Sequence, residues 1–169
     1  MLPEIINHTR IQGNECFGCG VHNDHGLNSE LAIDADQPDR LIGTFAPKEH
    51  MVGFPGITHG GAIYTALDCM GAWVPTLLKP DTKAIWILRS ANVTYHRPAF
   101  QGQPLTLTGR IQQEGGDWEP VTVEVQALNA DGGLLVSGEF KVTPLPADKF
   151  KKVAGISELP PNWKEFLET

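Results

Sequence analysis

The sequence has few cysteines, fewer basic than acidic residues, and no long apolar run. Three cysteines are too few and too unevenly spaced for a disulfide framework, so we expect reduced thiols. Lys and Arg number 13 against 20 Asp and Glu, which gives a formal net charge of −7 at pH 7. This charge opposes binding to the phosphates of nucleic acid or to an anionic membrane. We therefore expect neither partner.

No apolar stretch approaches the ~20 residues of a membrane span, and the first residues, MLPEIINHTR, lack the apolar core of a signal peptide. A cytoplasmic protein is expected.

The 169 residues leave room for one domain. We predict an N-terminal segment at 1–26, a central domain at 27–144 and a surface extension at 145–169. Short helices are predicted at Pro3 to Gln12 and at Asn162 to Glu168, the second capped by Asn162.

One long helix is predicted where the apolar period changes, from Thr58 onward. The residues that recur at helical spacing and share one face are Ala62, Ile63, Ala66, Leu67, Met70, Trp73 and Val74. Thr58 is expected to cap the helix start. Pro75 is expected to end or kink it, because proline lacks a backbone donor. The predicted helix runs from about Gly60 to Val74.

Strands are predicted on both sides of this helix. Before it, the DADQPD turn separates a run that contains Leu27, Leu31 and Ile33 from Leu41 to Phe45, which indicates a hairpin. After it, four β-rich runs indicate an antiparallel meander: Ala84 to His96, Pro104 to Gln113, Glu119 to Asn129 and Leu134 to Thr143. The pattern predicts an α+β fold, in which a curled antiparallel sheet wraps around one long central helix.

The second face of the predicted helix is small and nearly uncharged. At 100° per residue, it carries Gly61, Tyr64, Thr65, Asp68 and Ala72. A lone helix Asp is ordinarily a solvated surface charge. A face that met only water would usually carry Lys, Glu or Gln, so we infer that something packs here and that Asp68 is paired or functional.

The helix opens with the turn His59-Gly60-Gly61. Two glycines at a helix start expose backbone N–H groups, which together with the helix dipole can bind an anion or the oxyanion of an acyl transfer. Alternatively, the glycines only let strand and helix approach closely.

Three stretches resemble one family. GFPGITHGGAIYTALDCMGAW is similar to the PaaI-like acyl-CoA thioesterases of the hotdog superfamily, in which a catalytic Asp follows HGG after the same interval. CFGCGVHNDHGL resembles the start of one branch of these enzymes, and NVTYHRPAFQGQPL resembles their strand that ends in a YxRPA turn. The resemblance spans about Cys16 to Thr143. It implies a hotdog-fold acyl-CoA thioesterase without a cofactor.

By this resemblance, Asp68 would be the general base or the nucleophile, the Gly60 N–H would polarise the thioester carbonyl, and His59 would orient the turn or the substrate. A base takes a proton from water, whereas a nucleophile forms a mixed anhydride, and both roles stay open. The further candidates for substrate binding are Gly61, Thr65, His50, Glu49, Ser90 and Arg97.

Two positions depart from the family pattern. Relatives have an Asn where this chain has Gly53, and Glu49 or His50 could substitute for it. Relatives often have a Ser or Thr at the position of Leu88, whose face Ser90 would share by strand alternation. Arg89 and Arg97 could bind the phosphates of CoA, and a solvated strand end is the alternative for either.

The two proposed catalytic groups are far apart on the helix. Gly60 and Asp68 are eight residues apart, or about 12 Å along the axis. One thioester cannot contact both within one chain, so they would come from different chains across a two-fold axis. A homodimer or a dimer-of-dimers tetramer is expected.

The cysteine-rich segment raises the question of a metal. Cys16, Cys19, His22 and His25 are spaced like a compact zinc site, but the closeness of the two histidines makes joint ligation awkward, so we expect no metal. Cys69 is expected to be a small core residue. Two other functions remain: a non-catalytic acyl-CoA-binding hotdog module, and a hotdog hydratase, which the interval from HGG to Asp does not favour.

Overall fold

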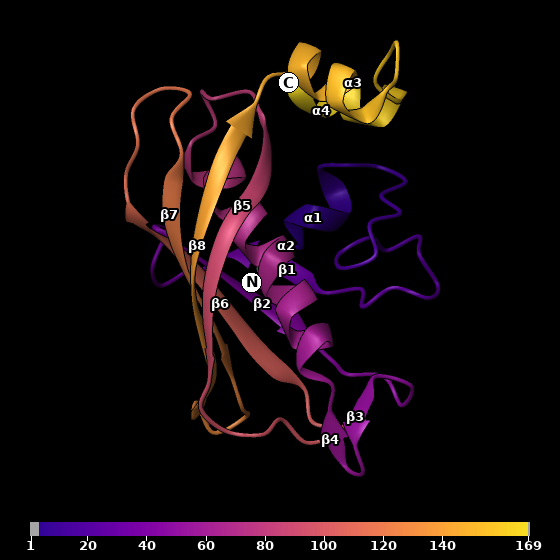
Figure 1. Ribbon diagram of the computed structural model, residues 1–169, viewed down its shortest axis with the longest axis vertical. Helices are drawn as coiled ribbons and strands as arrows, with labels where there is room; N and C mark the ends of the chain where they lie inside the picture. Colours follow the sequence, from indigo (N-terminus) through magenta and orange to yellow (C-terminus); the bar gives the residue numbers. More distant parts are fainter. Residues whose placement is uncertain (1–3, 169) are drawn as a thin grey trace.

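A six-stranded antiparallel sheet curls around one long helix in the computed structural model, which describes residues 4–168 (Figure 1). The strand order is β1-β2-β6-β7-β8-β5. The strands are β1 (Glu30–Ile33), β2 (Arg40–Phe45), β5 (Ile85–Tyr95), β6 (Leu105–Gln113), β7 (Val121–Leu128) and β8 (Leu134–Leu145). The helix, α2 (Gly60–Leu78), crosses one face of this sheet. The predicted α+β architecture is confirmed.

The apolar stripe of α2 forms the centre of the core. Ile63, Ala66, Leu67, Met70 and Val74 are buried against the sheet, as the helical period predicts. A Cβ at Gly109 of β6 would lie only 2.7 Å from Val74 Cγ2, so the close approach of sheet and helix requires a glycine there.

Helix α2 continues through Pro75, so the predicted end at Val74 is wrong. A proline inside a helix costs about 3 kcal/mol, mainly through one lost hydrogen bond and a clash with the preceding turn. Burial of Val74 and of Pro75 itself offsets this cost, since full burial of one apolar side chain contributes about 1.5–3 kcal/mol. The Lys79 N–H donates to the Pro75 carbonyl at 2.9 Å, which closes the last turn.

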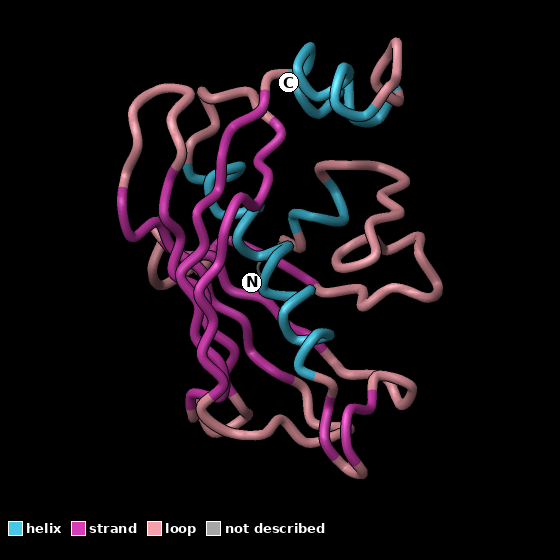
Figure 2. Tube along the Cα trace, viewed as in Figure 1, coloured by secondary structure: helices cyan, strands magenta, loops and turns pink. Residues whose placement is uncertain are grey.

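The order of the strands corrects the predicted meander. Strands β6, β7 and β8 pair in sequence, but β5 pairs with β8 and not with β6. The segment 96–104 therefore crosses from one edge of the sheet towards its middle (Figure 2). A small hairpin, β3 (Val52–Phe54) with β4 (Ile57–Thr58), was not predicted and lies beside the start of α2.

The N-terminal segment packs on the side of α2 that faces away from the sheet (Figure 1). Its helix α1 (Ile6–Thr9) is shorter than the predicted Pro3 to Gln12, of which Pro3 lies outside the described residues. The buried Asn7 amide donates to the carbonyls of Cys19 and Ser29, both at 2.8 Å, and accepts from the Leu31 N–H. Asn7 therefore fixes the cysteine-rich loop to β1.

The C-terminal segment forms two helices. Helix α3 (Ala147–Ala154) was not predicted and has no buried residue, whereas α4 (Pro161–Glu168) packs Trp163 and Phe166 against the core. Helix α4 begins at Pro161, so Asn162 lies inside the helix and is not its cap. The Asn162 amide instead donates to the Gln12 carbonyl at 2.7 Å. No helix among residues 4–168 is long and apolar enough to cross a membrane.

Candidate active site

His59, and not Thr58 as predicted, caps the start of α2. Its backbone is extended, and its Nδ1 accepts a hydrogen bond from the Gly61 N–H at 2.9 Å. Thr58 is instead the buried last residue of β4. The side chain of His59 thus occupies one exposed donor of the turn. Within residues 4–168, the Gly60 N–H donates to no backbone or side-chain acceptor, which leaves it as the available donor.

Tyr95, the last residue of β5, holds the same turn from the other side. Its hydroxyl donates to the Gly60 carbonyl at 3.0 Å, and a Cβ added at Gly60 would lie 3.1 Å from the Tyr95 ring. Tyr95 was not predicted as a site residue, although it begins the YxRPA turn. The contact joins residues 35 positions apart, so only the fold shows it.

A cleft of about 510 Å³ opens beside this turn. His59, Gly60 and Arg97 contribute to its wall, so three of the predicted site residues meet there. The remaining wall is mostly apolar or aromatic and includes Phe54, Ile57, Ile63 and Tyr95. Exposed apolar side chains also surround the cleft, since Phe54 is 73% exposed and Phe100 is 51% exposed.

Gly53 lies in the cleft wall, directly beside the cap. A Cβ at this position would stand 3.0 Å from the Cα of His59, so a larger side chain would push against the turn. This contact gives a physical reason for a glycine at this position. Glu49 and His50, the suggested substitutes, are exposed and do not line the cleft.

Asp68 lies two turns further along α2, outside the cleft. It is half-buried, and burial raises the pKa of its carboxyl above the usual value, with a smaller contribution from the nearby Cys16 thiolate. The Asp68 carboxylate contributes in turn to the raised pKa of Tyr64, after burial. Thr65 is bound within the helix, since its hydroxyl donates to the Gly61 carbonyl at 2.9 Å. Asp68 and Gly60 therefore face different parts of the surface of one chain.

Solved structures with this arrangement of sheet and helix identify the fold. The chain is similar to the E. coli PaaI protein from the phenylacetic acid degradation operon, with 16% identity and a TM-score of 0.61 over 71% of this chain and 81% of that one. The fold is the hotdog fold. Residues 55–136 also match the family described as Thioesterase superfamily. The CFGCG stretch lies outside this match, so its assignment to one branch stays a prediction.

Two further hotdog structures carry related ligands. A hypothetical thioesterase from Streptococcus pneumoniae TIGR4, described with coenzyme A, is 18% identical, with a TM-score of 0.59 over 69% of this chain and 85% of that one. A Streptococcus mutans UA159 protein bound to acetyl CoA is 20% identical, with a TM-score of 0.53 over 63% of this chain and 81% of that one. No curated protein matches the sequence significantly.

Ser90 and Leu88 lie on different faces of the hotdog sheet, so the prediction from strand alternation that they share a face is wrong. The register of β5 against β8 shifts between these residues, because Leu88 pairs with Val142 and Ser90 with Lys141. Such a bulge turns the following side chains to the opposite face. Ser90 therefore lies on the outer face with the exposed Lys141, away from Asp68, and Arg89 is likewise exposed.

Strand β5 forms a long edge of the hotdog sheet. Its 11 residues pair with β8 on one side only, and Ala91, Asn92, Thr94 and Tyr95 are exposed. An edge of this length presents a row of backbone donors and acceptors that can pair with another chain.

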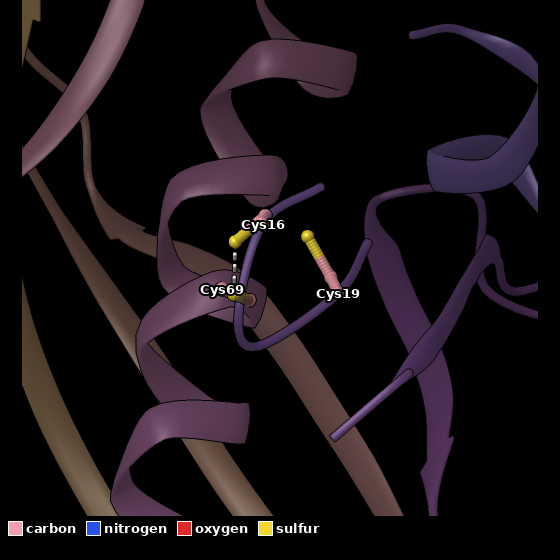
Figure 3. Close-up of side chains that lie close together, drawn as sticks. All are labelled: Cys16, Cys19 and Cys69. Atoms are coloured by element: carbon pink, nitrogen blue, oxygen red, sulfur yellow. Dashed lines mark hydrogen bonds between the residues drawn. The ribbon is translucent and has the colours of Figure 1, made fainter. Parts of the chain in front are cut away.

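Three cysteines meet on the other side of α2. The sulfur atoms of Cys16, Cys19 and Cys69 all lie within 4.8 Å of one another (Figure 3). Cys69 was predicted to be a core residue, and its contact with the other two cysteines was not predicted, because the only sequence signal was their CxxC spacing. His22 and His25 are exposed and do not belong to the group.

Proposed function

We propose that the protein hydrolyses an acyl-CoA thioester to a free acid and CoA. The observation that carries the proposal is the start of α2, where Gly60 lines a cleft of about 510 Å³ together with His59 and Arg97. The first backbone N–H groups of a helix lack partners within it, and such a donor stabilises negative charge on a carbonyl oxygen. The match of residues 55–136 to the Thioesterase superfamily supports the same chemistry.

Asp68 is proposed as the group that attacks or activates water. As a general base it takes a proton from water while the hydroxide adds to the thioester carbonyl; the C–S bond then breaks and CoA leaves as a thiol after gaining a proton. As a nucleophile it attacks the thioester carbonyl, the C–S bond breaks, and CoA leaves as a thiol after gaining a proton; water then hydrolyses the mixed anhydride to the free acid and the Asp68 carboxylate. Partial burial favours either role, because it removes water that would otherwise solvate the carboxylate.

The complete site is proposed to form between two chains. Gly60 and Asp68 are about 12 Å apart along one helix, too far for a single thioester. A two-fold axis beside β5 would pair the free edges of two sheets and bring the Asp68 of one chain near the Gly60 of the other. The exposed edge of β5 fits this arrangement. A homodimer, or a tetramer of two such dimers, follows.

The cleft is proposed to receive the substrate. Arg97 supplies a fixed positive charge for a CoA phosphate, while Phe54, Ile57 and Ile63 offer an apolar wall for the acyl or pantetheine part. Two of the similar solved proteins are described with coenzyme A or acetyl CoA. Both aromatic and short to medium aliphatic acyl groups fit a wall of this kind.

A panel of acyl-CoA substrates tests the proposal, with a thiol reagent measuring the released CoA. We expect Asp68→Asn to lower kcat by about 10²-fold or more while KM changes little, the scale of a positioned general base. The matched control is Asp117→Asn, which removes an exposed carboxylate from the loop between β6 and β7. Binding of acyl-CoA without turnover would instead indicate a non-catalytic module, and an unchanged kcat in Asp68→Asn would remove Asp68 from the mechanism.

A further inference from the structure

The cysteine-rich loop and helix α2 together build a cluster of three thiols. Cys16 and Cys19 lie in the loop and Cys69 in the third turn of the helix, so the group joins segments about 50 residues apart (Figure 3). The sulfur atoms of Cys16 and Cys69 are 3.8 Å apart. Free cysteines brought together from two elements form a ligand set of soft donors.

The separation of the sulfur atoms suits a tetrahedral ion. A zinc–sulfur bond of about 2.3 Å places two sulfurs of a tetrahedron about 3.8 Å apart. The distance between Cys16 Sγ and Cys69 Sγ has this value, and Cys19 Sγ lies within 4.8 Å of both. Cys19 Sγ would have to approach the other two sulfurs by up to about 1 Å to complete three bonds to one ion.

Two hydrogen-bond donors point at the sulfur of Cys19. The Trp73 indole N–H donates to Cys19 Sγ at 3.4 Å, and the buried Asn14 amide points at the same sulfur from 3.8 Å. Donors of this kind orient metal-bound thiolates in zinc sites.

The backbone of the loop comes unusually close to the helix at this point. An added Cβ at Gly18 would overlap with the sulfur of Cys69, so only glycine lets the loop place its cysteines there. Core packing alone gives no reason for three thiols to converge where the loop meets the helix.

We propose that Cys16, Cys19 and Cys69 bind one Zn²⁺ ion, with water as the fourth ligand. The three cysteines line an apolar cavity of about 150 Å³, which has room for that water. His22 and His25, on which the expectation of a metal-free loop rested, are not among the ligands. The ion would fasten the loop to α2 at the residue next to Asp68.

Metal titration of reduced, chelator-treated protein tests the proposal with Co²⁺ as the probe. We expect one Co²⁺ per chain, with thiolate-to-cobalt charge-transfer absorption that disappears when Zn²⁺ displaces the cobalt. Bound metal should also protect three thiols from a thiol reagent and raise the Tm, because a ligand that binds only the folded state stabilises it. None of these readouts depends on thioester hydrolysis.

Cys69→Ser should abolish the charge-transfer absorption and the rise in Tm, while its Tm without metal stays near that of the metal-free wild type. The matched control is the double variant His22→Ala and His25→Ala, which should still bind one ion. Three outcomes would overturn the proposal: less than a tenth of an equivalent of Co²⁺ in reduced protein, loss of binding in the histidine variant, or a Cys16–Cys69 disulfide that persists under reducing conditions.

Discussion

The Tyr95 hydroxyl donates a hydrogen bond to the carbonyl oxygen of Gly60. This bond joins the end of β5 to the first residue of α2, at the donor that we propose for the thioester oxygen. The peptide group between Gly60 and Gly61 is therefore held at both ends, its carbonyl by Tyr95 and its N–H by the cap at His59.

Tyr95→Phe should lower kcat/KM by about 2- to 10-fold, since a net hydrogen bond contributes about 0.5–1.5 kcal/mol. The phenyl ring keeps the packing against Gly60, so the Tm should change little. Steady-state kinetics measure the effect, with Trp118→Phe, an exposed aromatic far from the cleft, as the control. Wild-type kinetics in Tyr95→Phe would show that this bond does not position the turn.

Two inactive variants should complement each other if the site is shared between chains. Gly60→Pro removes the N–H donor at a helix position that tolerates proline, and Asp68→Asn removes the carboxylate. After mixing and refolding in equal amounts, half of the dimers contain both variants, and each of these has one intact site. About a quarter of wild-type activity should return. Gly60→Ala, which retains the N–H, is the control for the added Cβ, and a mixture without activity would contradict the shared site.

Asp68→Asn should raise the Tm at neutral pH. Burial raises the folded-state pKa of Asp68, so the folded chain holds this proton more tightly than the unfolded chain. In the wild type, the free energy that this protonation contributes to folding is fully present below the unfolded pKa of about 3.9 and is lost as the pH rises through the folded pKa. At pH 7 the wild-type carboxylate is charged, whereas the Asn of the variant stays neutral and does not lose this free energy.

We expect a measurable gain in Tm at pH 7, because the neutral Asn avoids the cost of a half-buried charge. The gain should shrink as the pH falls towards 4. Thermal unfolding at several pH values measures it, and Asp117→Asn should show no such dependence. A lower Tm for Asp68→Asn at pH 7 would indicate that the carboxylate is stabilised by a partner.

Cys16→Ser should move the acid limb of the kcat/KM profile of the metal-free enzyme to lower pH. The Cys16 thiolate is the second cause of the raised pKa of Asp68, so its removal makes the carboxylate easier to ionise. Glu15→Gln, which removes a neighbouring exposed charge, is the control. An unshifted limb would mean that the thiolate does not act on the catalytic carboxylate.

The sequence predicted the fold where local pattern and tertiary packing agree. The helical period placed Ile63, Leu67 and Met70 in the core, and the same period separated Asp68 from them. Pro75 was misjudged because a local rule on proline takes no account of the burial that holds the last turn. Thr58 was misjudged as the cap because the short strand β4, which it ends, has no clear sequence pattern.

The errors in the site have a common physical cause. Ser90 was assigned to the wrong face because a bulge shifts the register by one residue, and alternation cannot show an inserted residue. The positions of Tyr95 beside Gly60 and of Cys69 beside Cys16 depend on contacts between distant segments. No periodicity within one element reports such contacts.

The crossing segment 96–104 is bonded to the β3–β4 hairpin. The Thr58 N–H donates to the Ala99 carbonyl at 2.9 Å, the Gln101 N–H donates to the Gly56 carbonyl at 3.0 Å, and Ile57 forms a bridge with Phe100. Both sides of the cleft entrance are thus ordered before any ligand arrives. The conformational entropy of this entrance is lost when the chain folds, so a ligand that enters does not have to supply the free energy for ordering it.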